Sequence, residues 1–258
     1  MLQKGNFLDE TSFNEDEIQI VRSFQLLTVK PIFYIANISD GYHSDKHFKN
    51  FTYVGTACSY PLEKQSEINH TPLTEEEAYP ANPESSYGWS KLIGEYEIEL
   101  ASKEGLIKSS ILRLHNVYGP PCETSPELSQ VIPSLCRKLI LNEKYIIWGS
   151  GKQRRSFVYI SDVVKALLKS ISFKEGHKVI QIGPNESTSI MDIAEKLLKI
   201  SKKNISPIYD ISKPEGDFDR VPNITKANNI LKWKQEISID DGLELTYKWC
   251  FDHLLKNK

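Results

Sequence analysis

Residues 87–91, Tyr-Gly-Trp-Ser-Lys, decide how the fold and the site of this chain are interpreted. In a helix, residues four apart lie on the same face, so the Lys91 ammonium can approach the Tyr87 phenol. A free tyrosine has a pKa of about 10. A cation at about 4 Å is worth roughly 4 kcal/mol to the phenolate, or about 3 pKa units. The spacing therefore predicts that Tyr87 titrates near neutral pH, where acid–base catalysis is most efficient.

The same pair is also consistent with a half-buried helix tyrosine beside a solvated lysine, so its surroundings matter. Residues 51–55 form an apolar, β-prone run, and the polar stretch Thr56-Ala57-Cys58-Ser59-Tyr60-Pro61 follows it. This pattern predicts a strand that ends in a loop. Ligands of parallel α/β sheets bind beyond the carboxyl ends of the strands. Thr56 and Cys58 are therefore candidate site residues.

Downstream of this strand, β-prone runs alternate with amphipathic helices, which predicts an α/β fold. In the helix from 87 to about 103, Leu92, Ile93, Tyr96 and Leu100 are expected to form the buried stripe. Ser161 or Asp162, and Ser189, are expected to cap two later helices. The expected strands cover 109–114, 145–148, 154–160 and 178–182, and the expected helices cover 87–103, 129–141, 162–171, 190–201, 224–231 and 242–255.

The first fifty residues carry the weakest pattern. A helix over 13–28 and a short strand over 32–36 are predicted there. A dinucleotide-binding fold normally opens with a strand, a glycine-rich turn and a helix that receives the pyrophosphate. The sequence contains no such turn, and its nearest glycine pair, Gly149-Ser150-Gly151, lacks the third glycine.

Composition limits the class of protein. The chain has 258 residues, a formal charge of −2 and 40% hydrophobic residues, which is typical of a soluble globular enzyme. Nothing in the composition indicates a basic patch that would bind nucleic acid. The four cysteines lack metal-ligand spacing, so neither a zinc site nor a disulfide framework is predicted, and a reducing, cytoplasmic setting is expected. No segment approaches the ~20 apolar residues of a membrane span, and the N-terminus lacks the apolar core of a signal peptide.

Five segments together resemble one known family. They are YVGTACSYP, SSYGWSK, LRLHNVYGP, WGSGKQRRSFVYISDV and SKPEGDFDRVPNITKA, in this order between residues 53 and 227. The set resembles the extended short-chain dehydrogenase/reductase family of NAD-dependent nucleotide-sugar epimerases, dehydratases and reductases. Within it, the likeness is greatest to the GDP-L-fucose synthases, with the GDP-mannose 3,5-epimerases next.

The resemblance implies a Rossmann-like parallel sheet with a smaller mixed α/β substrate-binding lobe. Residues 1–119, with about 156–183, would form the cofactor domain, and residues 120–155 and 184–258 the nucleotide-sugar-binding lobe. The chain is expected to be an N-terminally truncated form, because fifty residues cannot hold all the strand–helix steps that relatives place before residue 51. NADP or NAD is the implied cofactor, although the glycine-rich turn is missing.

The resemblance also implies catalytic roles. Thr56, Tyr87 and Lys91 match the family's Ser/Thr-Tyr-Lys triad, in which the hydroxyls handle a proton while the nicotinamide exchanges a hydride with a sugar carbon. Cys58 matches the cysteine that serves as a carbon base in the fucose synthases and mannose epimerases, and a buried structural cysteine is the alternative. Where the fucose synthases carry an acid histidine before Val-Ile-Pro, this chain has Gln130, which cannot exchange a proton near neutral pH.

Further positions are implied to bind the cofactor or the nucleotide-sugar. Asn116 matches an asparagine near the nucleotide-sugar and, with Tyr87, Lys91 and Leu114, is expected at the cofactor. The preceding His115 is interpreted as structural. Arg155 and Arg220 resemble the arginines that meet the diphosphate in relatives, and a guanidinium is well shaped for a diphosphate. The expected substrate-binding residues are Asn116, Val131, Trp148, Arg155, Lys213 and Arg220.

Two hypotheses follow. The first is an NAD(P)-dependent enzyme that reduces or epimerises a nucleotide-hexose, with a GDP-sugar favoured and another nucleotide-sugar 4-epimerase or dehydratase as the alternative. The second is a catalytically impaired remnant or partner subunit that keeps the nucleotide-sugar site. Retention of the four catalytic positions favours the first, and the missing glycine-rich turn favours the second. A homodimer through the helix that carries Tyr87 and Lys91 is expected from the resemblance alone.

Overall fold

The computed structural model describes residues 50–66, 72–172, 176–213, 216 and 218–256. The helix predicted over 13–28 and the strand predicted over 32–36 lie outside these residues.

A three-stranded parallel sheet organises the first half of the described chain. It consists of β1 (Asn50–Thr56), β2 (Lys108–Leu114) and β7 (Lys178–Ile182), in the order β1-β2-β7. The register pairs Thr56 with Leu114, and Leu114 with Ile182, so the three carboxyl ends meet at one edge. The predicted parallel α/β arrangement is confirmed, and it places Thr56 at the edge where such sheets bind ligands.

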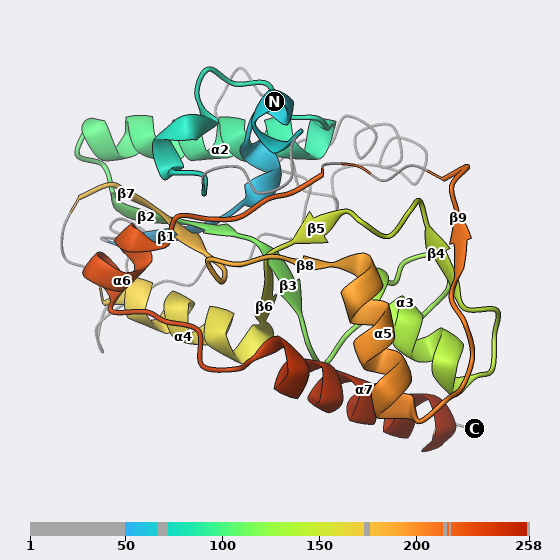
Figure 1. The fold of residues 1–258 in the computed structure, drawn as a ribbon. Helices are drawn as coiled ribbons and strands as arrows, with labels where there is room; N and C mark the ends of the chain where they lie inside the picture. Colours follow the sequence, from blue (N-terminus) through green and yellow to red (C-terminus); the bar gives the residue numbers. More distant parts are fainter. Residues whose placement is uncertain (1–49, 67–71, 173–175, 214–215, 217, 257–258) are drawn as a thin grey trace, which may run out of the picture.

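Helices cover both faces of this sheet. Figure 1 shows α2 (Ser86–Lys103) along one face and α4 (Ile160–Ile171) along the other, with α6 (Thr225–Leu231) beside β7. The α4 face is apolar, because Leu112, Ile180 and other buried residues of the strands form one cluster with residues of α4 and α6. The Trp233 side chain, which follows α6, joins this cluster and donates from Nε1 to the Asp162 carbonyl at 2.8 Å.

The helix α2 was predicted with almost the observed bounds, but its predicted buried stripe is wrong. Leu92 is buried, whereas its three other members are exposed by 51%, 53% and 39%: Ile93, Tyr96 and Leu100. The face that meets the sheet instead carries Gly94 and Glu95. Gly94 gives room for the Tyr53 ring, and Glu95 is buried because it pairs with a buried arginine.

A second hydrophobic cluster is built from buried residues between Tyr118 and Cys250. It joins the inner faces of the helices α3, α5 and α7, of which α3 and α7 pack most extensively against each other. Beside them, β4 pairs in parallel with β9. The predicted cap of α5 is confirmed, since Ser189 Oγ accepts from the Asp192 amide at 3.0 Å. These elements are α3 (Val131–Ile140), β4 (Ile146–Trp148), α5 (Ile190–Ser201), β9 (Ile208–Asp210) and α7 (Ile239–Lys256).

The single strand predicted over 154–160 is two strands. Ser156 separates β5 (Arg154–Arg155) from β6 (Phe157–Tyr159), and its hydroxyl donates to the Pro184 carbonyl at 2.7 Å. β5 pairs with β8 (Thr188–Ser189) and β6 with β3 (Asn116–Tyr118). The cap predicted for α4 is wrong as well. Asp162 lies inside the first turn, fully buried, and accepts from the amides of Glu236 and Ile237.

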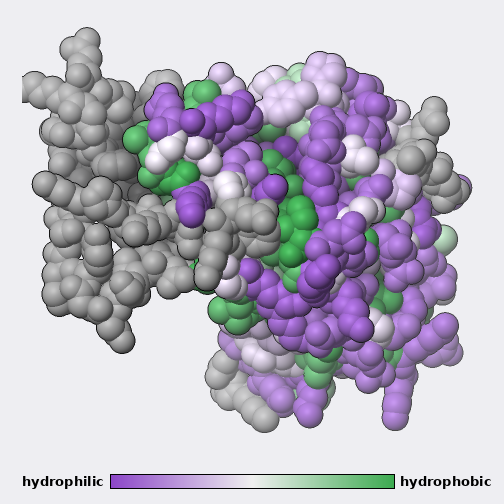
Figure 2. Space-filling model, turned by 90° about the vertical axis from the view of Figure 1, so that its left-hand side faces the viewer, coloured by the Kyte–Doolittle hydropathy of each residue, from purple (hydrophilic) through white to green (hydrophobic). Residues whose placement is uncertain are grey.

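The surface of the described part is mostly hydrophilic on the face that Figure 2 presents, and apolar residues reach it in patches between polar ones. Among the helices that the structure describes, none combines the length and the apolar character that a membrane crossing needs.

Candidate active site

A cavity of about 500 Å³ opens where β1 and β2 end. Its apolar wall comes from β3, α3 and β6 and includes Tyr118, Ile132 and Phe157. Eight of the predicted site residues line it: Thr56, Cys58, Tyr87, Leu114, Asn116, Gln130, Val131 and Arg220. The structure therefore brings together, in one hollow, side chains that are far apart in the sequence, such as Cys58 and Arg220, which lie 162 positions apart.

Thr56 and Tyr87 are joined at the floor of this cavity. Thr56 ends β1 and begins the short helix η4 (Ala57–Ser59), and its Oγ1 accepts from the Cys58 amide at 3.2 Å. Its hydroxyl also forms a hydrogen bond with the Tyr87 hydroxyl. Tyr87 sits in the first turn of α2, where Ser85 Oγ caps the helix by accepting from the Gly88 amide at 3.2 Å. Two hydroxyls are thus held side by side, as the proton-handling pair was predicted to be.

The acidity of Tyr87 differs from the prediction. Burial raises its pKa above the ordinary value, the hydrogen bond with Thr56 lowers it only in part, and Cys58 raises it further. Lys91 does not contribute, because its Nζ donates to the Val54 carbonyl at 2.9 Å and lies 5.1 Å from the centroid of the Tyr53 ring. The prediction that Lys91 brings Tyr87 close to neutral titration is wrong for this arrangement. A long lysine side chain can reach several acceptors, and here it reaches the strand.

Cys58 faces a positive charge that the sequence did not assign to it. Arg220 Nη1 donates to Cys58 Sγ at 3.3 Å, and Arg220 is buried. Arg155 lies beside the same two residues. Burial lowers the pKa of Arg155 to about 10, and Arg220 adds to this effect, whereas Cys58 opposes it. A cation within hydrogen-bond distance is the feature that distinguishes reactive cysteines from inert buried ones.

Gln130 and His115 complete the polar part of the wall. Gln130 stands directly before α3, and its side chain makes no cap bond to that helix. His115 is buried, and its Nε2 lies 3.0 Å from Gln181 Oε1. Burial lowers the pKa of His115 to about 3, so its ring is neutral at physiological pH. This agrees with the interpretation of His115 as structural.

Four predicted residues do not line this cavity: Lys91, Trp148, Arg155 and Lys213. Two of them meet each other at another place. Lys213 Nζ lies 5.6 Å from the centroid of the Trp148 ring, and Trp148 is exposed at the end of β4. Their predicted role toward the nucleotide-sugar stays a prediction.

Gly88 is a site residue that the sequence reasoning passed over. A Cβ at this position would collide with the carbonyl oxygen of Cys58, so only glycine lets the first turn of α2 lie against η4. The signal was present, because glycine is costly inside a helix and needs a packing reason. The close approach sets the distance between the Tyr87 and Cys58 segments.

Comparison with known proteins gives a family match and several relatives. The model of the NAD dependent epimerase/dehydratase family matches residues 36–183. GDP-mannose 3,5-epimerase from Arabidopsis thaliana is 32% identical over 211 residues, which are 81% of this chain and 55% of the relative. A putative UDP-glucose 4-epimerase from Methanocaldococcus jannaschii is 36% identical over 188 residues, 71% of this chain and 58% of the relative. The chain thus spans little more than half the length of these relatives.

A solved structure supports the fold. UDP-glucose 4-epimerase from Thermotoga maritima, crystallised with UDP-glucose, superposes with a TM-score of 0.73 at 27% identity, over 80% of this chain and 64% of that one. The predicted likeness to GDP-L-fucose synthases is also found, for example with the probable rice enzyme at 23% identity over 81% of this chain and 65% of that relative. This identity is lower than that of the two epimerases above.

Proposed function

The chain belongs to the NAD-dependent epimerase/dehydratase family, and from this premise we propose that it epimerises or reduces a GDP-hexose in the cavity beside Tyr87. The observation that carries the proposal is the meeting of two pairs in one hollow: Thr56 with Tyr87, and Cys58 with Arg220. Each pair has a chemical use on a sugar, one at an oxygen and one at a carbon.

The hydroxyl pair would act at a sugar oxygen. Tyr87 gives a proton to, or takes one from, this oxygen, while the Thr56 hydroxyl donates a hydrogen bond to the same atom and stabilises its developing negative charge. The raised pKa of Tyr87 keeps the phenol protonated in the described arrangement, which suits the step that gives a proton to the sugar oxygen while hydride is returned to the carbon. Movement of the Lys91 ammonium from Val54 toward the phenol would favour the reverse step.

Cys58 would act at a carbon next to a carbonyl. Its sulfur would accept the carbon-bound proton, and the guanidinium of Arg220, with Nη1 at 3.3 Å from Sγ, would stabilise negative charge on the sulfur. Gln130 stands where fucose synthases have an acid histidine and can only hydrogen-bond. The proposed epimerisation therefore uses Cys58 on one face of the sugar. The proton for the other face comes from a group other than Gln130.

The residues near the cavity fit the nicotinamide end of NAD(P). Thr56, Tyr87, Lys91 and Asn116 offer two hydroxyls, an ammonium and an amide to its ribose and carboxamide, and Leu114 offers an apolar contact. When bound, the cofactor supplies or accepts the hydride at the sugar carbon. The titrations with NADH and NADPH described below compare the cofactor forms without and with the 2′-phosphate.

The choice of a GDP-sugar rests on relatives. A GDP-mannose 3,5-epimerase is 32% identical to this chain, and a 4-epimerase that acts on UDP-glucose by name is 36% identical over a shorter stretch. The Cys58–Arg220 pair favours the GDP-sugar of the 3,5-epimerase over the UDP-sugar of the 4-epimerase, because a base at carbon suits inversion beside a carbonyl. A UDP-sugar 4-epimerase is the second candidate, favoured by the superposition with the UDP-glucose complex.

Calorimetric titration of the full chain tests the proposal. We expect heat from NADH or NADPH, then from GDP-mannose more strongly than from UDP-glucose. Arg220→Gln should weaken the sugar nucleotide by roughly tenfold, as the loss of a charge-assisted hydrogen bond predicts. No heat at millimolar cofactor would overturn the enzyme hypothesis in favour of the partner subunit, and a preference for UDP-glucose would overturn the GDP assignment.

A homodimer is part of the proposal. Ile93, Tyr96 and Leu100 form an exposed apolar stripe on α2, which a second copy of the helix would cover. Light scattering should give twice the chain mass of 29.5 kDa, and Tyr96→Lys should return the protein to one chain. A wild-type monomer at micromolar concentration would contradict this part alone.

A further inference from the structure

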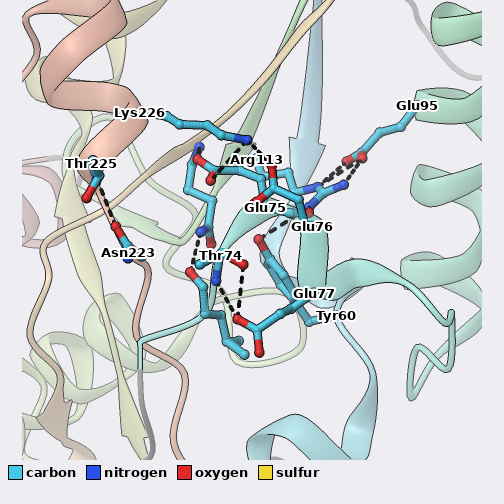
Figure 3. A network of polar contacts seen from close by, with 12 residues as sticks. Tyr60, Thr74, Glu75, Glu76, Glu77, Glu95, Arg113, Asn223, Thr225 and Lys226 are labelled. Atoms are coloured by element: carbon cyan, nitrogen blue, oxygen red, sulfur yellow. Dashed lines mark hydrogen bonds and ion pairs between the residues drawn. The ribbon is translucent and has the colours of Figure 1, made fainter.

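A buried guanidinium lies behind the cavity, on the α2 side of the sheet. Arg113, on β2, is only 2% exposed, and it forms a bidentate pair with Glu95 of α2. Its Nε lies 3.1 and 2.9 Å from the two carboxylate oxygens, and its Nη2 lies 2.7 Å from Oε2. Figure 3 shows this pair at one end of a polar network.

The other edge of the same guanidinium holds the loop after Cys58. Nη1 donates to the Tyr60 hydroxyl at 3.3 Å and to the Glu75 carbonyl at 2.6 Å (Figure 3). The guanidinium carbon also lies 5.2 Å from the centroid of the Tyr60 ring. Burial alone would lower the pKa of Arg113, but its contacts with Tyr60 and Glu95 outweigh burial and hold it above its ordinary value.

The segments that Arg113 joins are the ones that carry the reacting groups. Glu95 is two helical turns beyond Tyr87 on α2, and its carboxylate lies so close to Gly55 that a Cβ there would collide with it. Tyr60 is two residues after Cys58, is fully buried, and its carbonyl accepts from Gln65 Nε2 at 3.1 Å. One cation thus sets the position of the end of β1, the turn with Cys58 and the helix with Tyr87.

Stability is a poor explanation for this arrangement. Well-packed apolar side chains usually stabilise an interior at least as well as a buried ion pair, because the two charges must leave water. The opposite face of the same sheet is packed in that way, with Leu112 and Ile180 at 0% exposure. What an ion pair adds is direction, since a guanidinium fork accepts few geometries.

We propose that Arg113 is a positioning residue of the active site, which holds Tyr60 and Glu95 so that Cys58 stays against Arg220. The proposal rests on the proposed function for its choice of reacting groups. Its test does not need turnover, because the chemical reactivity of Cys58 can be measured directly in the full chain.

The experiment compares two tyrosine variants that lose one buried hydroxyl each. Tyr60→Phe removes the contact with Arg113. Tyr145→Phe removes the hydrogen bond from Tyr145 to the Ala194 carbonyl, 3.1 Å long, in the other cluster. Both tyrosines are buried, so the two variants should lose similar stability. The readout is the rate of Cys58 alkylation by iodoacetamide at pH 7, followed by peptide mass spectrometry, with Cys58→Ser defining the background.

Alkylation of Cys58 should slow about tenfold in Tyr60→Phe, the size of one hydrogen bond from a charged group, and stay at the wild-type rate in Tyr145→Phe. Arg113→Lys should slow it at least as much, because an ammonium cannot reach Glu95, Tyr60 and Glu75 at once. The Cys58 amide donates a hydrogen bond to Thr56 Oγ1 at 3.2 Å, and hydrogen exchange at this amide should speed up in the same variants.

An unchanged or faster alkylation rate in Tyr60→Phe, with exchange at Cys58 also unchanged, would overturn the proposal and leave Arg113 as a structural residue. Tyr60→Phe alone decides the matter if Arg113→Lys does not fold. A failure of nucleotide-sugar binding would leave this result intact, so the two proposals fail separately.

Discussion

The two faces of the three-stranded sheet bury different kinds of side chain. Toward α4, the strands present Leu112, Ile180 and Ile182, all fully buried in one apolar cluster. Toward α2, the same strands present Arg113 and Gln181, which are buried just as deeply. Because side chains alternate along a strand, one short sequence builds both faces.

The difference teaches what each face does. The apolar face can gain its stability from contact area alone, which is non-directional. On the polar face the buried side chains of Arg113 and Gln181 are held by directed hydrogen bonds: Gln181 donates from Nε2 to the Leu73 carbonyl at 2.6 Å, and its amide donates to Glu75 Oε1 at 3.0 Å. This second face ends beside Thr56 and Cys58. We conclude that the apolar face mainly stabilises the fold, whereas the polar face mainly positions the residues of the site.

Breaking the ion pair should have the largest effect. Arg113→Ala leaves the Glu95 carboxylate buried without its cation, which should cost about 3–5 kcal/mol of unfolding free energy in urea. The double variant Arg113→Met with Glu95→Leu removes both charges and should cost much less. Equal losses in the single and double variants would contradict the distinction between the two faces.

Gly88→Ala should have the next largest effect. Its Cβ meets the Cys58 carbonyl, so either α2 or η4 must shift, at about 1–3 kcal/mol for overpacking. Gly176→Ala is the matched control, because a Cβ there meets nothing within 4 Å. Thermal unfolding of both variants, with Cys58 alkylation as a second readout, checks this. A Gly88→Ala protein that resembles Gly176→Ala in both measurements would show that the close approach is unnecessary.

The buried His115, which links the cavity wall to Gln181, should give the stability a pH dependence. Its folded pKa of about 3 lies below the unfolded value of about 6.5. Its contribution is therefore complete above pH 6.5 and is lost as the pH falls toward 3. Relative to pH 7.5, the wild type should lose about 1 kcal/mol more than His115→Gln by pH 5.5. Parallel pH profiles of urea unfolding for the two proteins would argue against a buried, neutral histidine.

Lys226→Gln should have the smallest effect. Lys226 pairs with Glu76 at the surface and lies 3.6 Å from Glu75 Oε2 at the outer end of the polar network. Because its side chain is 35% exposed, the pair is screened, and its loss should cost less than about 1 kcal/mol and fade in high salt. A loss as large as that of Arg113→Ala would mean that this surface pair stabilises the fold as much as the buried pair does.

Sequence reasoning located the scaffold of the site because strong local patterns set it. The apolar run before Thr56 predicted β1, and the Tyr-x-x-x-Lys spacing with its flanking residues predicted α2. Both elements are observed within one or two residues of the expected bounds. Thr56, Cys58 and Tyr87 come from one loop and one helix that are near each other in sequence, and all three line one cavity. Their catalytic roles stay a prediction.

The remaining features depend on tertiary contacts that no local pattern encodes. Lys91 selects the Val54 carbonyl, which is 37 positions away, over the phenol one turn away. Arg220 reaches Cys58 across 162 positions. The buried stripe of α2 was misjudged because apolar residues were expected inside, whereas Glu95 occupies that place through its pairing with Arg113.

The most direct test of the central claim is the turnover of Tyr87→Phe with a GDP-hexose and the cofactor. The variant removes one hydroxyl from a half-exposed ring and should leave stability and nucleotide-sugar affinity close to wild type. We expect a fall in kcat of at least about 100-fold, the contribution of a positioned proton donor. An active wild-type enzyme whose kcat is unchanged by Tyr87→Phe would contradict the assignment of this cavity as the place where the sugar oxygen is protonated.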